Sequence, residues 1–183
     1  LHTAYRRQRQ MCIRDRAESH KLMIRGGYIR QVTAGVYAYL PLGYRVLRKA
    51  EGIIEQEMDK INVPEMIMPH LLPATLWQES GRYKKYGAEM FKLKDRHGRE
   101  SLLGPTHEET FTEIIAKNLK SYKQMPLALY QIQTKFRDEN RPRFGLLRGR
   151  EFVMLDGYSF AATRDQLDEQ FDDQKNAYKR IFK

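Results

Sequence analysis

Residues 136–152 read FRDENRPRFGLLRGREF, and this stretch decides which fold the sequence predicts. It contains five arginines, two glycines and a proline, a composition that is typical of a loop. The segments on either side, 127–136 and 151–155, are rich in apolar side chains and have the length of strands. We therefore predict two antiparallel strands joined by an arginine-rich loop.

The clearest helix is predicted upstream of these strands, at residues 42–61. Asn62 marks its end, and Pro64 enforces the stop because proline cannot continue a helix. Apolar side chains recur at 3.6-residue spacing and share one face, which we expect to be mainly core. That face consists of Val46, Leu47, Ala50, Ile53, Ile54, Met58 and Ile61.

The remaining strands are short. Hairpins are expected at residues 29–40, around Gly35, and at 91–103, around the polar turn 95–99. A further short strand is expected at residues 65–68.

Three more helices are expected, at residues 19–25, from Thr106 to residue 119, and from Thr163 onward. Thr106 with Glu109 has the spacing of a capping box, and Thr163 with Gln166 caps the last helix. Hairpins flanked by helices predict an α+β domain with an antiparallel sheet.

The charge of the chain is positive and uneven. Its 183 residues include 33 Lys and Arg against 23 Asp and Glu, which gives a formal charge of +10 and favours partners such as nucleic acid or nucleotide phosphates. Residues 1–16 hold five arginines and one acidic residue and show no helical or strand periodicity. We expect this basic extension to be disordered or non-native, with an RNA-contacting arm or a targeting piece as alternatives. Residues 17–183 form the expected domain.

Several classes of protein are excluded by composition. No uncharged apolar run approaches the roughly 20 residues that span a bilayer, so we expect a soluble, cytoplasmic protein. Cys12 is the only cysteine in the sequence, which rules out an intramolecular disulfide and a cysteine-based metal cluster. The sequence has neither a G-x-x-x-x-G-K-[ST] loop nor a G-x-G-x-x-G turn, so a bound nucleotide needs another kind of site.

The histidines do not suggest a metal site, and we predict none. We expect His107 to be an exposed loop histidine, with contact with a bound ligand as the alternative. The other four show no metal-ligand spacing: His2, His20, His70 and His97.

The arginine-rich stretch has the side chains that a phosphate ligand requires. Arginine pairs with phosphate through two parallel hydrogen bonds. Arg137 and Glu139 are two residues apart on a strand, so both point to the same face, and the carboxylate can accept from an exocyclic amine. Phe152 can stack on a base. The alternative is a solvated hairpin tip with surface ion pairs and a core phenylalanine.

Several separated segments resemble conserved motifs of class II aminoacyl-tRNA synthetases. Residues 136–139 (FRDE) with 148–152 (RGREF) resemble motif 2, and residues 42–45 (LGYR) with 66–69 (MIMP) resemble motif 1. The loop 104–109 (GPTHEE) resembles the amino-acid-binding loop of bacterial prolyl-tRNA synthetases. The same family fits residues 76–82 and 93–99, so the resemblance runs from about residue 18 to residue 183.

This resemblance implies an incomplete class II sheet and an enzyme that activates proline with ATP. It implies that Arg137 is the catalytic residue, which holds the α-phosphate near the proline carboxylate. Glu139 would read the adenine amine, Arg148 would contact the outer phosphates, and Phe152 would stack on adenine. Mg²⁺ is expected with ATP because it commonly bridges ATP phosphates.

The resemblance also implies that Thr106 and Glu108, together with Arg137, bind proline. A hydroxyl and a carboxylate are suitable partners for its secondary ammonium. Taken without the resemblance, Thr106 is an N-cap and the two acids are the usual residues of a helix's first turn, with Glu109 as the capping partner. Both roles of Thr106 can coexist.

The remaining implications concern the whole enzyme. Its partners are tRNA(Pro), proline and a second subunit, bound through motif 1. Leu155 and Gly157 stand where the bacterial family commonly has lysine and alanine. Motif 3, the editing domain and the anticodon-binding domain are absent, so we expect an inactive fragment of a longer protein. A threonyl- or seryl-specific relative and a non-catalytic RNA-binding paralogue are the alternatives.

Overall fold

The centre of the molecule is a pair of long antiparallel strands. In the computed structural model, which describes residues 17–183, β6 (Leu127–Phe136) pairs with β7 (Glu151–Phe160) without a break in register, from Leu127–Phe160 to Phe136–Glu151. The predicted strands and their arginine-rich connection are confirmed, and β7 extends five residues beyond the predicted end. The predictions made for residues 1–16 lie outside the described residues.

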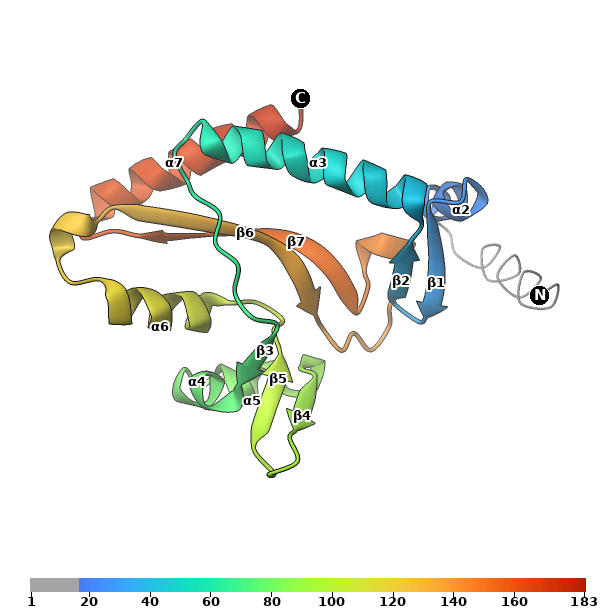
Figure 1. The fold of residues 1–183 in the computed structure, drawn as a ribbon, viewed down its shortest axis with the longest axis horizontal. Helices are drawn as coiled ribbons and strands as arrows, with labels where there is room; N and C mark the ends of the chain where they lie inside the picture. The colour runs from blue at the N-terminus through green and yellow to red at the C-terminus, as the bar shows by residue number, and fades with distance from the viewer. Residues whose placement is uncertain (1–16) are drawn as a thin grey trace.

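Helices cover both faces of this strand pair (Figure 1). Side chains alternate along β6, so Ala128 and Tyr130 pack on α3 (Pro41–Asp59) and α7 (Arg164–Ile181). Leu129 points to the other face and packs against α6 (Glu108–Asn118). The expected α+β architecture is confirmed. The C-terminal end of β6, which carries Lys135, lies between α6 and the arginine-rich loop.

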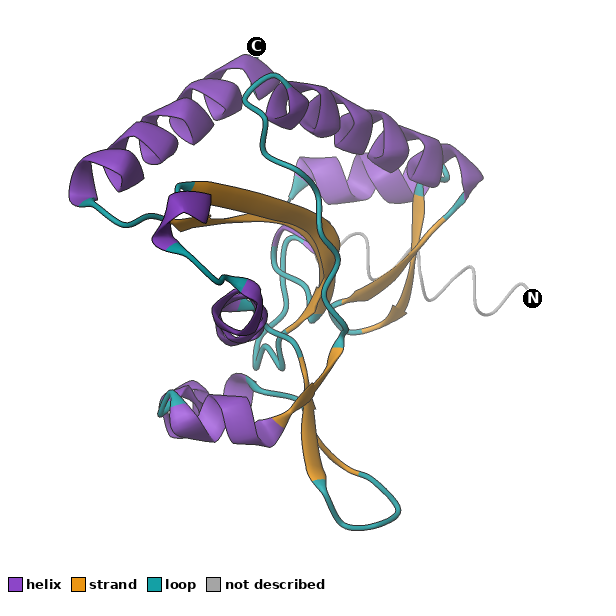
Figure 2. Cartoon of the chain, turned by 60° about the vertical axis from the view of Figure 1, so that its left-hand side comes forward, coloured by secondary structure: helices purple, strands orange, loops and turns teal. Residues whose placement is uncertain are grey.

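Residues 71–103 form a small lobe of their own beneath α6 (Figure 2). Its three-stranded antiparallel sheet has the order β3-β5-β4. The elements of the lobe are β3 (Leu71–Pro73), α4 (Ala74–Glu79), α5 (Arg82–Tyr86), a 3₁₀ turn (Gly87–Glu89), β4 (Lys92–Lys94) and β5 (Glu100–Leu103). A separate core of Leu72, Trp77, Met90 and Leu102 fills it. The predicted hairpin at 91–103 is confirmed as β4–β5.

The N-terminal elements contact the arginine-rich loop. Helix α2 (Glu18–Arg25) precedes the hairpin of β1 (Ile29–Thr33) and β2 (Val36–Tyr39), as predicted. Gly35 has a φ of +75°, and a Cβ at this position would lie 2.8 Å from Pro142 Cβ. Its carbonyl accepts a hydrogen bond from the backbone N–H of Arg150 at 2.7 Å. The tight turn therefore allows the hairpin to touch the loop.

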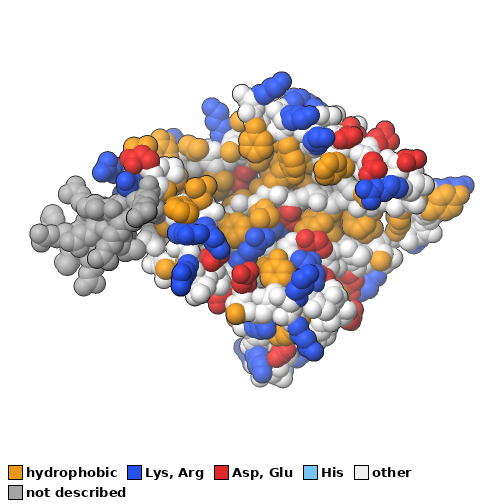
Figure 3. Space-filling model, turned by 180° about the vertical axis from the view of Figure 1, so that it is seen from behind, with side chains coloured by type: hydrophobic (Ala, Val, Ile, Leu, Met, Phe, Trp, Pro, Cys, Tyr) orange, Lys and Arg blue, Asp and Glu red, His pale blue; other side chains and the backbone are white. Residues whose placement is uncertain are grey.

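The apolar face of α3 is only partly core, which corrects the sequence expectation. Met58 is fully buried, but Val46 and Ile53 are 53% and 44% exposed. The reason is that α7 reaches only the C-terminal part of α3, where Arg180 pairs with Glu57 at 2.5 Å. Apolar side chains therefore remain on the surface (Figure 3).

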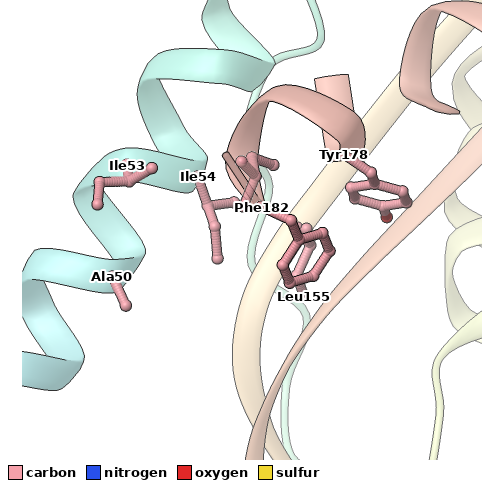
Figure 4. Close-up of a pocket in the computed structure, with 7 residues that line it drawn as sticks. Ala50, Ile53, Ile54, Leu155, Tyr178 and Phe182 are labelled. Carbon is pink, nitrogen blue, oxygen red and sulfur yellow. The ribbon is translucent and has the colours of Figure 1, made fainter. Parts of the chain in front are cut away.

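Part of this face lines an open apolar pocket of about 460 Å³ between α3, β7 and α7 (Figure 4). Its lining consists of Ala50, Ile53, Ile54, Leu155, Tyr178, Ile181 and Phe182.

Two other boundaries differ from those predicted. Residues 65–68 form a single parallel bridge between Glu65 and Tyr130 rather than a strand. The helix expected from Thr106 begins at Glu108, while the cap at Thr163 is confirmed because its side chain accepts from the backbone N–H of Gln166. Among residues 17–183, no helix combines the length and the apolar character needed to cross a membrane.

Two glycines of α3 give a matched test of packing. A Cβ at Gly43 would lie 2.1 Å from the carbonyl oxygen of Tyr28, whereas a Cβ at Gly52 meets nothing within 4 Å. We expect Gly43→Ala to lower the free energy of unfolding by about 1–3 kcal/mol through overpacking. Gly52→Ala should raise it by up to about 1 kcal/mol, because alanine has the higher helix propensity. Urea unfolding of both variants measures this, and equal effects would contradict the assigned packing.

Candidate functional site

The arginine-rich loop and the adjoining strand ends enclose a cavity of about 430 Å³. The structure brings together all four side chains that the sequence assigned to a nucleotide: Arg137, Glu139, Arg148 and Phe152. The remaining lining residues are Glu89, Leu147, Gly149 and Met154. Glu89 comes from the small lobe, and sequence reasoning missed it because it lies 48 residues before Arg137 without any motif that links the two.

The charged groups of this cavity are already ordered. Arg148 Nε donates to Glu139 Oε2 at 2.8 Å, and the backbone N–H of Arg141 donates to Glu139 Oε1 at 3.2 Å. The hydrogen bond from Arg148 holds the pKa of Glu139 below its ordinary value. Glu139 is therefore an ionised acceptor with a fixed position, and Arg148 is held beside it.

Arg137 connects this cavity to the loop 104–109. Its Nε and Nη2 each donate to the carbonyl oxygen of Pro105 at 3.3 Å. Its guanidinium lies 5.4 Å from the centre of the Phe152 ring. Since both hydrogen bonds are long, an anionic ligand can replace them at small cost.

The loop itself presents a carboxylate and a hydroxyl that are in contact. Thr106 Oγ1 donates to Glu108 Oε2 at 2.5 Å, and Thr106 is 7% exposed. Thr106 does not cap α6, because its hydroxyl is used on this carboxylate and the N-cap is His107. The predicted capping box is therefore wrong, and Glu109 instead accepts from Ser80 Oγ at 3.0 Å.

Arg82 is a second residue of the site that the sequence did not reveal. Its Nη1 donates to Glu108 Oε2 at 3.1 Å and to Glu109 Oε2 at 3.2 Å. Burial alone would raise the pKa of Glu108, but the hydrogen bonds from Thr106 and Arg82 bring it below the ordinary value. Glu108 is thus a carboxylate at neutral pH, and it suits a cationic group of a ligand.

A cluster of buried polar side chains from β6 and β7 packs against the loop 104–109. Lys135 is fully buried, with its Nζ 2.6 Å from His107 Nδ1 and 2.8 Å and 2.9 Å from the two oxygens of Asp156. The Tyr158 hydroxyl donates to Asp156 and accepts from the backbone N–H of His107 at 3.2 Å. Gln131 Nε2 also donates to Asp156, at 2.8 Å. The cluster therefore joins β6, β7 and the loop.

His107 is fully buried in this cluster, which corrects the expectation of an exposed loop histidine. Burial, and then repulsion by Lys135, lower its pKa, so the ring is neutral at pH 7. Nδ1 accepts from the Lys135 ammonium, and Nε2 donates to the carbonyl oxygen of Pro69 at 3.1 Å. Its hydrogen bonds fix the loop to β6, to β7 and to Pro69 in the segment that precedes β3.

The two positions that depart from the bacterial family pattern lie away from this site. Side chains alternate along β7, so Asp156 and Tyr158 face the loop while Leu155 faces α3 and α7. Leu155 lines the apolar pocket of Figure 4. A Cβ at Gly157 would lie 2.9 Å from Gln174 Oε1 of α7. Neither residue lines the cavity of Arg137.

The described part of the chain has no group of three or more His, Cys, Asp or Glu side chains arranged to hold a metal ion. A divalent cation at this site would therefore need oxygen ligands from the bound molecule as well as from Glu89 or Glu139.

Comparison with known proteins gives consistent results. Residues 91–183 match the family model described as tRNA synthetase class II core domain (G, H, P, S and T). The chain is 98% identical over 167 residues to a proline–tRNA ligase of Lactobacillus helveticus, and 63% identical over 166 residues to one of Limosilactobacillus reuteri. Each match covers 91% of this chain but only 30% and 29% of those relatives, so the chain spans less than a third of their length.

Solved structures show the same fold. A Giardia lamblia prolyl-tRNA synthetase in complex with prolyl-adenylate superposes with a TM-score of 0.82 at 24% identity, covering 88% of this chain and 34% of that chain. The RNA binding domain of a Cryptosporidium parvum threonyl-tRNA synthetase gives a TM-score of 0.79 at 26% identity, covering 86% and 40%.

The buried ion pair beneath the loop can be tested by unfolding. Lys135→Met leaves the carboxylate of Asp156 buried without its cation, so we expect the free energy of unfolding to fall by about 3–5 kcal/mol. Adding Asp156→Asn to this variant should recover part of the loss, because no uncompensated charge then remains. Lys84→Met, at an exposed position, is the control and should change stability by less than about 0.5 kcal/mol. Additive effects of the two buried substitutions would contradict the pairing.

Proposed function

Because the chain belongs to the family of class II tRNA synthetase core domains (G, H, P, S and T), we propose that it is part of a proline–tRNA ligase. The high identity to proline–tRNA ligases of lactobacilli supports proline as the amino acid. In the proposed reaction the carboxylate of proline attacks the α-phosphate of ATP, which forms prolyl-adenylate and releases pyrophosphate. A terminal ribose hydroxyl of tRNA(Pro) then attacks the prolyl carbonyl, which forms the ester bond, breaks the bond to the phosphate and releases AMP.

The observation that carries this proposal is the position of Arg137 between two differently charged compartments. On one side lies the cavity with Arg148, Glu139 and Phe152, which suits the phosphates, the amine and the ring of ATP. On the other side lies the loop with Glu108, which suits an ammonium group. A bond between proline and the α-phosphate must form where these two compartments meet.

The chemistry requires alignment rather than a general base. The carboxylate of an amino acid is already ionised at neutral pH, so no proton has to leave it. Arg137 would place the carboxylate and the α-phosphate together and stabilise the charge that develops on the phosphate oxygens. Thr106 and Glu108 would orient the proline ring through its ammonium. Glu139 would accept from the adenine amine, and Phe152 would stack on adenine.

Mg²⁺ would enter this site together with ATP. The donor set fits such a role, because Mg²⁺ usually binds one or two carboxylates and the phosphates of its substrate. Glu89 is the cavity carboxylate without an ion pair among the described residues, and it would be the protein ligand of the ion. When bound, the cation would neutralise phosphate charge.

The assembly proposed for the whole protein is a cytoplasmic homodimer. Supporting it is the exposed apolar face of α3, with Val46 and Ile53, since a contiguous exposed apolar patch marks a surface for protein–protein contact. The partner RNA is tRNA(Pro).

Arg137→Ala tests the catalytic assignment. Residues 17–183 would replace the corresponding residues of the Lactobacillus helveticus relative. This full-length protein would be assayed by proline-dependent ATP–pyrophosphate exchange. We expect kcat to fall by about 10²–10³, as for other lost transition-state donors. Arg141→Ala removes an exposed arginine of the same loop and should leave exchange unchanged. Exchange with threonine or serine instead of proline would show that the enzyme activates a different amino acid. Undiminished exchange in Arg137→Ala would reject the role of Arg137.

Glu108→Gln tests the amino-acid pocket. A charge-assisted hydrogen bond is worth about 1.5–3 kcal/mol, so KM for proline should rise by about 10- to 100-fold while KM for ATP stays within about threefold. Although burial raises the pKa of Glu108, its hydrogen bonds hold that pKa below the ordinary value, so the carboxylate is charged throughout neutral pH and loses its charge only as the pH falls through that lowered pKa. KM for proline should therefore show no contribution from Glu108 between about pH 6 and 8. Glu113→Gln on the same helix is the control, and equal effects on both substrates would contradict a proline-specific role.

A further inference from the structure

The positive charge of the described chain is concentrated in one segment. Residues 17–183 hold 28 Lys and Arg against 22 Asp and Glu, a net charge of +6. Residues 82–99, which we name the basic lobe, hold seven basic and two acidic residues, a net charge of +5. The basic residues are Arg82, Lys84, Lys85, Lys92, Lys94, Arg96 and Arg99. Nearly all of the excess charge therefore lies in about a tenth of the chain.

Most of these cations are exposed and lack a counterion. Lys84, Lys85, Lys92 and Arg96 are exposed, and none of them forms an ion pair with another described residue. Lys94 lies 3.9 Å from Glu100, at the outer limit of an ion pair. A cluster of unpaired cations on one surface creates a local positive potential that attracts polyanions.

The lobe holds these cations in a defined arrangement. β4 is the edge strand of its sheet, and the alternation of side chains places Lys92 and Lys94 on the same face, about 7 Å apart. In the turn that follows, Asp95 Oδ1 accepts from the backbone N–H groups of His97 and Arg99 at 2.8 Å and 2.9 Å. Asp95 is thus used to close the turn, and Arg96 stands at its tip.

The basic lobe is attached to both halves of the proposed active site. Arg82 bonds to Glu108 at 3.1 Å, in the proline loop. The carbonyl oxygen of Glu89 accepts from the backbone N–H of Asp138 at 2.8 Å, and the Arg150 guanidinium lies 5.0 Å from the centre of the Phe91 ring. A polyanion bound to the lobe would consequently be held next to the cavity of Arg137.

We propose that the basic lobe binds the phosphate backbone of the acceptor end of tRNA. The inference rests on the proposed function, because that function requires the end of a long polyanion to reach this cavity. ATP does not account for the lobe, since the cavity cations Arg137 and Arg148 belong to a different segment. Lysines spread along an edge strand and a short helix suit contacts to phosphates, which position an RNA without reading its sequence.

The test is a triple variant of the full-length protein described above, Lys92→Ala with Lys94→Ala and Arg96→Ala. We expect kcat/KM for tRNA in aminoacylation and the affinity for tRNA in fluorescence anisotropy to fall about tenfold at 0.1 M salt. The dependence of log affinity on log salt should become shallower by about two to three, because each lost phosphate contact removes about one from the slope. Proline-dependent ATP–pyrophosphate exchange, which needs no tRNA, should stay within twofold.

The matched control removes three cations from α7: Arg164→Ala, Lys175→Ala and Lys179→Ala. It lowers the net charge equally but should change tRNA affinity by less than twofold. An equal loss in the control, an unchanged tRNA affinity in the lobe variant, or a parallel loss of exchange would each overturn the proposal. Absence of exchange in the parent protein would reject the proposed function alone, because the anisotropy measurement still decides whether the lobe binds tRNA.

Discussion

The buried ammonium of Lys135 is the group on which the arrangement of the site depends. It stands on β6, pairs with Asp156 on β7 and donates to His107 in the loop, so this one charge connects both central strands to the loop 104–109. A buried cation without these partners would be strongly unfavourable. The loop that carries Thr106 and Glu108 can therefore adopt few other positions while the strand pair is intact.

The side chains of the candidate site lie around this buried group and come from both the central strands and the small lobe. Arg137 extends the polar side of β6 by one further step, so it lies at the border between the loop and the arginine-lined cavity. Arg82 and Glu89 reach the same border from the small lobe. The small lobe therefore contributes Arg82 and Glu89 to the candidate site, although its own hydrophobic core is separate.

The two faces of the central strands serve different purposes. One face carries the polar side chains of the site, and the other, with Leu155, packs against α3 and α7. Successive side chains along β7 point to opposite faces, so Leu155 and Asp156 lie on different sides of the strand pair. Leu155 and Gly157 therefore bear on packing with α7 and the apolar pocket rather than on the ligands.

Local pattern by itself determined the long helix, the hairpins, and the arginine-rich connection between two strands, because each depends on neighbouring residues. The helix ends at Asp59, two residues before the predicted end. The same pattern collected Arg137, Glu139, Arg148 and Phe152, which lie within one hairpin. Only the tertiary structure decided that His107 is buried, that Thr106 bonds to Glu108 instead of capping α6, and that Arg82 and Glu89 join the site. The physical reason is that burial and ion pairing depend on segments brought together from distant parts of the chain, and no periodicity within a single segment encodes such contacts.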